Sequence, residues 1–246
     1  MSLNFVAIDF ETANKKRGSV IQLGIARILN GAVTKTATAF ITPPPGLDYF
    51  DPSNTAIHGI RPADLVGARA WPDVLESIVR FTGDLPLVGH NVSFERSCIV
   101  QASEAHGFTA PEFDYYCTLK LSRKVLPKEP SHRLGKLSAS LGLPDFSHHD
   151  AGADAIACAN LLFELAARKD RYELDFLPAG WSSRRSRPLT VPATVVLPLP
   201  MVVPPTALPV VTTVMSTPAT VSDTAPSVVA PFLSVPPTGL GEELWD

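Results

Sequence analysis

Cysteine is scarce in this chain, and its pattern argues against two kinds of site. The 246 residues contain only Cys98, Cys117 and Cys158. An odd number of cysteines without paired spacing predicts neither a disulfide framework nor a zinc site built on thiolates. We therefore expect buried, reduced thiols and a cytoplasmic protein.

Long apolar runs and an excess of one charge are also missing. The valine-rich runs of the chain are too short and too interrupted for a membrane span, and the start MSLNFVAIDF lacks the features of a signal peptide. We therefore expect no membrane partner. The formal net charge of −3 excludes a broadly basic nucleic-acid coat. A local basic surface stays open, because binding depends on where the cations lie.

Proline is abundant but unevenly placed. Half of the 24 prolines lie between about Ser182 and Asp246, and almost no charge occurs from Pro188 to Ser222. Proline removes a backbone donor and restricts φ, so neither a helix nor a paired strand persists in such a segment. The composition predicts one folded domain over residues 1–181 and a disordered, Pro/Val/Thr-rich tail over residues 182–246.

Hydrophobic patterning in the first part of the chain predicts an α/β domain with a mixed sheet. Apolar runs predict strands at Asn4–Phe10, Val20–Leu29, Thr34–Ile41 and Leu85–Gly89. Asn30-Gly31 lies between the second and third runs and indicates a hairpin. Helical patterns occur at Arg61–Val66, Trp71–Thr82, Ser93–His106, Leu119–Leu126, Leu134–Leu141 and Ala151–Ala167.

Two carboxylates stand at the end of the first predicted strand. Asp9 and Glu11 are two residues apart, so their side chains project to the same face. Two such carboxylates repel each other unless a cation lies between them. The D-x-E string is common, however, and a solvated strand end explains it equally well.

A third acid opens a predicted helix, in the string His90-Asn91-Val92-Ser93-Phe94-Glu95. Glu95 shares a helix face with Ile99 and Ala102, where a carboxylate is costly unless it is paired or binds a metal. By itself, an acid in the first turn is better explained by its interaction with the helix dipole.

A fourth acid opens the last predicted helix. Asp154 shares a face with Cys158, Leu161 and Leu165, so it too stands at the head of an apolar stripe. His149 precedes it by five residues, close enough to contribute to the same site. The strings D-x-E-T, H-N-x-x-F-[DE] and H-x-x-x-x-D, in this order, are far more specific together than each is alone.

With these three strings, the chain resembles the DnaQ-like (DEDDh) exonuclease family, which includes the proofreading epsilon subunit of bacterial DNA polymerase III. The resemblance covers roughly residues 4–168 and extends to Asn54–Ile60, Cys117–Arg123 and Leu134–Leu143. It implies a ribonuclease-H-like fold, with a five-stranded mixed sheet flanked by helices.

The resemblance also implies a metal-dependent 3′→5′ exonuclease. Asp9 would bridge two divalent cations, Mg²⁺ or Mn²⁺, and Glu11 and Asp154 would hold the first of them. His149 would act as general base, since a histidine exchanges protons near neutral pH. Two cations about 4 Å apart stabilise both the attacking and the leaving oxygen, and oxygen ligands favour hard cations.

Glu95 departs from the family, which usually has aspartate at this position and often uses it to contact the second cation through water. The extra methylene moves the carboxylate by roughly 1.5 Å. Two hypotheses follow: an active enzyme, or a catalytically impaired binding module recruited to the replication or repair machinery through its tail. The tail ends in Gly241–Asp246, whose acidic and aromatic character suits a docking peptide, although a frayed terminus explains it better.

The expected substrate is nucleic acid with a free 3′ end, single-stranded or frayed DNA being favoured over RNA. The candidate substrate-binding residues are Thr12, His58, Asn91 and Phe94, although core packing explains Phe94 better than base stacking does. Two groups of cations could neutralise phosphates or could be ordinary solvated charge. They are Lys15, Lys16 and Arg17, and then Lys120, Arg123, Lys124, Lys128, Arg133 and Lys136.

Overall fold

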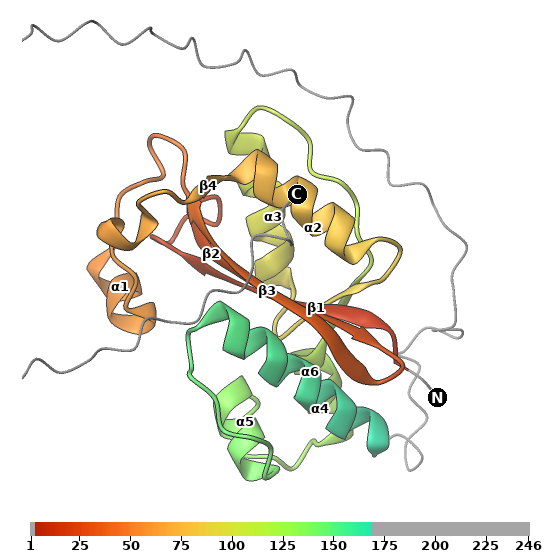
Figure 1. Ribbon diagram of the computed structural model, residues 1–246. Helices are drawn as coiled ribbons and strands as arrows, with labels where there is room; N and C mark the ends of the chain where they lie inside the picture. The colour runs from red at the N-terminus through yellow and green to blue at the C-terminus, as the bar shows by residue number, and fades with distance from the viewer. Residues whose placement is uncertain (1–2, 169–246) are drawn as a thin grey trace, which may run out of the picture. The chain divides into compact units, whose positions relative to one another are not determined.

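The computed structural model describes residues 3–168 (Figure 1). Its strands are β1 (Phe5–Thr12), β2 (Val20–Leu29), β3 (Ala32–Thr42), β4 (Arg69–Ala70), β5 (Leu87–Gly89) and β6 (Tyr115–Cys117). Its helices are α1 (Pro52–His58), the 3-10 turn η1 (Pro62–Leu65), α2 (Trp71–Thr82), α3 (Ser93–Ala105), α4 (Thr118–Val125), α5 (Leu134–Ser140) and α6 (Ala151–Ala167). The boundary predicted at residue 182, the disordered tail and its docking role lie outside the described residues.

The strands form one mixed sheet in the order β4-β3-β2-β1-β5-β6. β1, β2 and β3 form an antiparallel meander, whereas β5 lies parallel to β1 and β6 lies parallel to β5. The predicted fold class is confirmed, but the sheet has six strands where five were expected. The sixth is β4, whose two residues pair with Ile41 and Thr42 at the edge and are too few to show a hydrophobic period.

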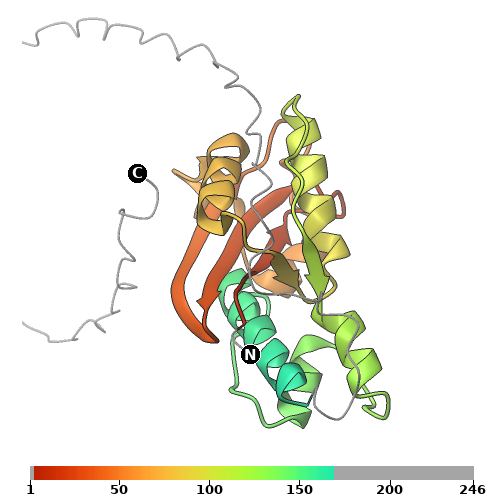
Figure 2. The same cartoon turned by 90° about the vertical axis from the view of Figure 1, so that its right-hand side faces the viewer.

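Helices cover both faces of the sheet because the side chains of β1 alternate between two cores. Val6, Ile8 and Phe10 pack with α2 and α3, and Phe5 and Ala7 pack with α4, α5 and α6. The two groups of helices accordingly lie on opposite sides of the sheet (Figures 1 and 2). Among residues 3–168, none of the helices combines the length and apolar character needed to cross a bilayer.

The three cysteines are free thiols. Cys98 and Cys158 are buried in the two cores, and Cys117 is partly buried. Burial raises the pKa of the Cys98 and Cys158 thiols, so both stay protonated and behave as small apolar side chains. Buried thiols were expected, and two of the three are of this kind.

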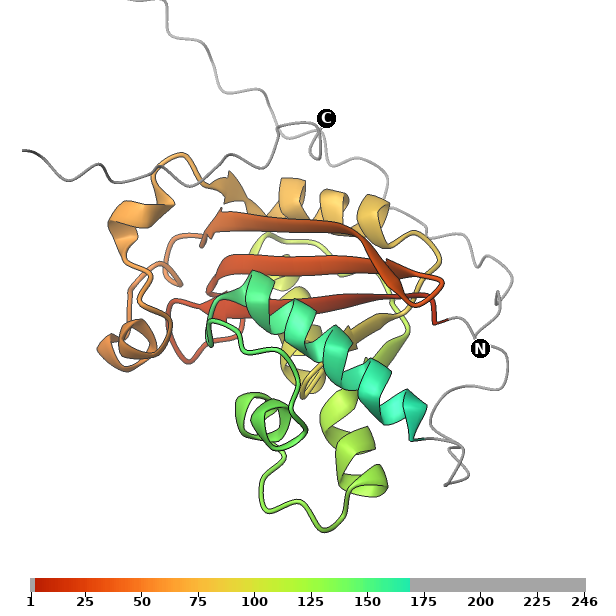
Figure 3. The same cartoon turned by 60° about the horizontal axis from the view of Figure 1, so that its bottom comes forward.

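Gly24 of β2 lets α6 cross the sheet at close range (Figure 3). A methyl group at this position would overlap the backbone carbonyl of Ala151, the first residue of the helix. The amide of Ala151 also donates to Oε1 of Gln22, at 3.1 Å. Since Gly24 is the register partner of Asp9 on β1, this approach brings the first turn of α6 beside Asp9.

Candidate active site

The three acidic strings of the sequence converge on one open cleft of about 420 Å³. The cleft lies where β1 ends, where β5 leads into α3, and where α6 begins. Every site residue expected from the sequence lines it. These residues are Asp9, Glu11, Thr12, His58, Asn91, Phe94, Glu95, His149 and Asp154.

Asp9 and Glu11 project from β1 toward α6, on the face that Phe5 and Ala7 occupy further back along the strand. Burial raises the pKa of Asp9 well above its usual range, and the charges of Glu95, Asp154 and Glu11 raise it further. Burial, with the charges of Asp154 and Asp150, raises the pKa of Glu11 to about 8. Both carboxyls therefore lack a sufficient counter-charge within the protein.

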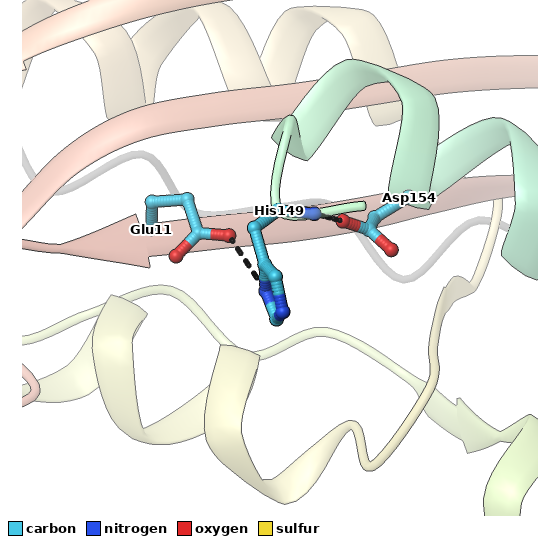
Figure 4. A group of neighbouring side chains, drawn as sticks. All are labelled: Glu11, His149 and Asp154. Carbon is cyan, nitrogen blue, oxygen red and sulfur yellow. Dashed lines mark hydrogen bonds and ion pairs between the residues drawn. The ribbon is translucent and has the colours of Figure 1, made fainter. Parts of the chain in front are cut away.

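His149 and Asp154 are joined by the turn that opens α6. His149 has a left-handed backbone (φ 63°), which a residue other than glycine adopts at some cost, and its amide donates to Oδ2 of Asp154 at 2.7 Å. The imidazole points toward β1, with Nδ1 3.8 Å from Oε1 of Glu11 (Figure 4). One possible ligand atom from each of these three residues lies within 4.8 Å of the other two.

Glu95 is the most deeply buried of the four acids, with 2% of its surface exposed. Its side chain lies close to Gly89 at the end of β5, and its Oε2 atom has no hydrogen-bond partner. Burial raises the pKa of Glu95 to about 8, and Glu95 is the charge that most raises the pKa of Asp9. The longer glutamate arm thus reaches the same cluster as the other acids.

The burial of this cluster suits the binding of a divalent cation. Four carboxylates with raised pKa values, one of them holding a buried oxygen without a partner, are stabilised by positive charge between them. Carboxylate oxygens form a donor set that hard divalent metals prefer. The residues present therefore fit a metal centre.

The opposite wall of the cleft is built on α1. Nδ2 of Asn54 donates to the carbonyl of Thr12 at 3.0 Å, which ties α1 to the end of β1. His58, the last residue of α1, accepts at Nδ1 from the amide of Ile60 (3.0 Å), and burial lowers its pKa. Ile57 also lines the cleft and is 55% exposed, although its side chain is large and apolar.

Phe94 makes two kinds of contact, one with the core and one with a cation. Part of its ring packs against the core beneath α3, and the guanidinium of Arg17 lies over the ring, 4.1 Å from its centroid. Arg17 and Lys15 line the cleft, whereas Lys16 does not. Asn14 was missed as a cleft residue, because it holds the backbone carbonyls of Leu47 and Tyr49 and carries no local signal for this. Asn54, which lies in the segment Asn54–Ile60 of the family resemblance, also lines the cleft.

The sequence profile of the RNase T family, described as Exonuclease, matches residues 6–162, which include all nine expected site residues. The chain belongs to this exonuclease family. Its relatives include the PolC-type DNA polymerase III proteins of Latilactobacillus sakei (31% identical over 166 residues) and Streptococcus pyogenes (30% over 164 residues). The matches cover 67% and 65% of this exonuclease chain but only 11% of each relative.

Solved structures of other exonucleases share the fold of this domain. Exonuclease X in complex with 5′ overhanging duplex DNA has a TM-score of 0.53 and 23% identity, covering 70% of this chain and 96% of that one. The nuclease domain of 3′hExo, a DEDDh family member bound to rAMP, has a TM-score of 0.58 and 16% identity, covering 68% and 92%. At these identities the likeness establishes the fold, which is that of the DEDDh exonucleases.

Proposed function

We propose that this domain is a metal-dependent 3′→5′ exonuclease that hydrolyses phosphodiester bonds at free 3′ ends, with DNA as the favoured substrate. The observation that supports it most is the meeting of four carboxylates and one imidazole in a single cleft. They come from β1, the start of α3 and the start of α6, which are distant in sequence. Burial and mutual repulsion make the charged form of such a cluster costly, and a bound cation offsets that cost.

The carboxylates divide into a pair on the strand and a pair on the helices. In our proposal Asp9, Glu11 and Asp154 would hold two divalent cations, Mg²⁺ or Mn²⁺: Asp9 would serve both, Glu11 and Asp154 would serve the first, and Glu95 would serve the second. When bound, the cations supply the positive charge that stabilises the attacking and leaving oxygens of the reacting phosphate. The raised pKa values favour this assignment, because a bound cation offsets the repulsion that burial strengthens.

His149 is the proposed general base. Its backbone is held by Asp154, while its side chain stays 55% exposed at the mouth of the cleft, where it can reach the attacking water. Nδ1 of His149 lies 3.8 Å from Oε1 of Glu11, so the proposed proton acceptor faces the acidic cluster directly.

The terminal nucleotide is proposed to bind between the end of β1, α1 and the start of α3. Thr12, His58, Asn91 and Phe94 line this part of the cleft. The structure of 3′hExo bound to rAMP supports a nucleotide site in a domain of this fold. Because Arg17 already lies over the ring of Phe94, a base that stacks on Phe94 must use another part of the ring or displace the guanidinium.

The presence of glutamate at position 95, where the family usually has aspartate, supports one alternative function: a binding module with impaired catalysis. Such a module would bind DNA ends, and its tail would recruit it to a polymerase or another replication or repair protein. The PolC-type relatives make a polymerase the first partner to test. The position of Glu95 within the cluster supports the enzyme instead.

The deciding experiment is hydrolysis of a 5′-labelled single-stranded oligonucleotide, as DNA and as RNA, with Mg²⁺, Mn²⁺ or excess EDTA. A ladder that shortens by one nucleotide at a time, and only with metal, is expected. A closed circular strand of the same composition is the matched control, because it has no 3′ end. Early release of the labelled mononucleotide would reverse the proposed direction, and activity in EDTA would exclude the metal mechanism. Binding without shortening would establish the module.

A further inference from the structure

A second hollow, of about 760 Å³, adjoins the cleft, and the two share His90, Asn91, Leu134, His149 and Asp154. It runs between α4, the segment of residues 126–133, α5, and the turn that precedes α6, a region seen below the sheet in Figure 3. We call it the α4–α5 groove. Most of the residues that line this groove lie outside the three acidic strings.

The charge of the α4–α5 groove is opposite to that of the cleft. Arg123, Arg133 and Lys136 line it and are exposed, and within residues 3–168 none of them forms an ion pair with an acid. The single acid along its lining is Asp154, at the junction with the cleft. An open groove with uncompensated cations attracts a polyanion, and here it leads to a site built for phosphate chemistry.

The wall of the groove is held in place by His90, at the end of β5. Its Nε2 donates to the carbonyl of His132 at 2.8 Å, so its Nδ1 accepts from the hydroxyl of Thr118 at 2.9 Å. Burial lowers the pKa of His90 to about 4, which keeps the ring neutral and this pattern intact at neutral pH. Nδ1 of His132 pairs in turn with the hydroxyl of Ser122, at 3.0 Å. The segment before Arg133 is therefore positioned in advance of binding.

We propose that the α4–α5 groove binds the phosphodiester backbone of the substrate strand on the 5′ side of the reacting phosphate. This inference rests on the proposed exonuclease function, which places the terminal nucleotide on the other side of the acidic cluster, near α1. A strand that continues past Asp154 and His149 then passes beside Arg123, Arg133 and Lys136. The preferred substrate is consequently a strand several nucleotides long rather than a dinucleotide.

The groove also divides the basic cluster of the sequence into two sets. Arg123, Arg133 and Lys136 line it. Lys120 and Lys128 do not, although both are also exposed and close in sequence. The chain thus offers its own charge-matched control. An Arg123→Ala/Lys136→Ala double variant and a Lys120→Ala/Lys128→Ala double variant each lose two positive charges.

The first measurement is the affinity of each full-length double variant for a labelled single-stranded DNA of about 15 nucleotides, in EDTA and over a range of salt. The groove variant is expected to bind at least about tenfold more weakly at low salt. Its plot of log affinity against log salt should be shallower by about 1.4, since each lost phosphate contact removes about 0.7 for a single strand. The control variant should stay close to wild type.

The second measurement compares two substrates in Mg²⁺: the same oligonucleotide, and the p-nitrophenyl ester of thymidine 5′-monophosphate, which has a reacting phosphate but no further strand. In the groove variant, kcat/KM should fall at least about tenfold more on the oligonucleotide than on the ester. The proposal is overturned if the two double variants behave alike in both assays. If wild type hydrolyses neither substrate, the proposed function fails instead, and the binding assay still decides the groove.

Discussion

The acidic cleft and the α4–α5 groove are neighbours that share five lining residues, but the charges along them are opposite in sign. Glu95 and Asp154 in the cleft are 2% and 9% exposed, and burial raises the pKa of both. Arg123 and Lys136 in the groove are exposed. Buried charges are costly and are kept only where a partner compensates them, whereas exposed charges cost little. Substitutions in the cleft should therefore change the rate of hydrolysis, and substitutions in the groove should change the affinity for the nucleic-acid strand.

The largest effect is expected from neutralising Asp154. Asp154→Asn keeps an oxygen for the amide of His149 but removes one negative charge from the cation site, so hydrolysis should fall by at least about 100-fold. Asp150→Asn is the matched control, four residues earlier. Asparagine can replace the N-cap bond that Asp150 forms with the amide of Ala153, so activity should stay within a few-fold of wild type. Equal losses in the two variants would show that general charge, rather than a defined site, matters.

The next effect concerns the approach of α6 to the sheet. Gly24→Ala places a methyl group against the backbone of Ala151, which cannot move without shifting the helix, so stability should fall by about 1–3 kcal/mol and hydrolysis should fall with it. Gly135→Ala is the comparison variant, because the atoms nearest its methyl group belong to the side chain of His148 rather than to the backbone. Thermal unfolding should show the larger loss for Gly24→Ala. A Gly24→Ala protein as stable and active as wild type would contradict the packing described for α6.

A third, smaller effect is a pH-dependent stability that comes mainly from the buried acids of the cleft and outweighs the opposite contribution of His90. The pKa values of Glu11 and Glu95 are about 8 in the folded protein, against 4.5 as ordinary glutamates. Between these values the folded state binds more protons than the unfolded state, so without metal stability should fall as pH rises from 5 to 8. Mg²⁺ should restore it at pH 8 more than at pH 5. Melting temperatures in EDTA and in Mg²⁺ test this, and Glu95→Gln should flatten the EDTA curve. A melting temperature in EDTA that rises over the same range would exclude the buried cluster.

The smallest effect is expected from Glu95→Asp, which keeps the charge and shortens the arm. Hydrolysis should stay level or rise by less than about tenfold, since the change restores the usual family residue within the same cluster. Glu95→Gln keeps the length and removes the charge, so its loss should exceed that of Glu95→Asp. Steady-state rates with Mg²⁺ and Mn²⁺ compare the two. A loss of about 100-fold in Glu95→Asp would show that the rest of the cleft is adapted to glutamate.

Two helices with a clear hydrophobic pattern were predicted with the bounds that the structure shows. The patterns at Trp71–Thr82 and Ala151–Ala167 coincide with α2 and α6, because each buries an apolar face. α1 was missed because none of its residues is buried, so it shows no apolar stripe. β6, at Tyr115–Cys117, was missed because three residues cannot establish an alternation.

What the sequence determined by itself is the type of residue at each chemically important place: acids at the end of one strand and at the start of two helices, and a histidine before one of them. These are local features, governed by neighbours a few residues away. The tertiary structure alone decided which of these groups face one another. The close crossing at Gly24 brings Asp154 to Asp9, and the left-handed turn at His149 directs its ring toward Glu11. Which cations between α4 and α5 line the groove could not be predicted from the sequence. The answer depends on how α4, α5 and the turn before α6 pack together, and these segments are separated along the chain.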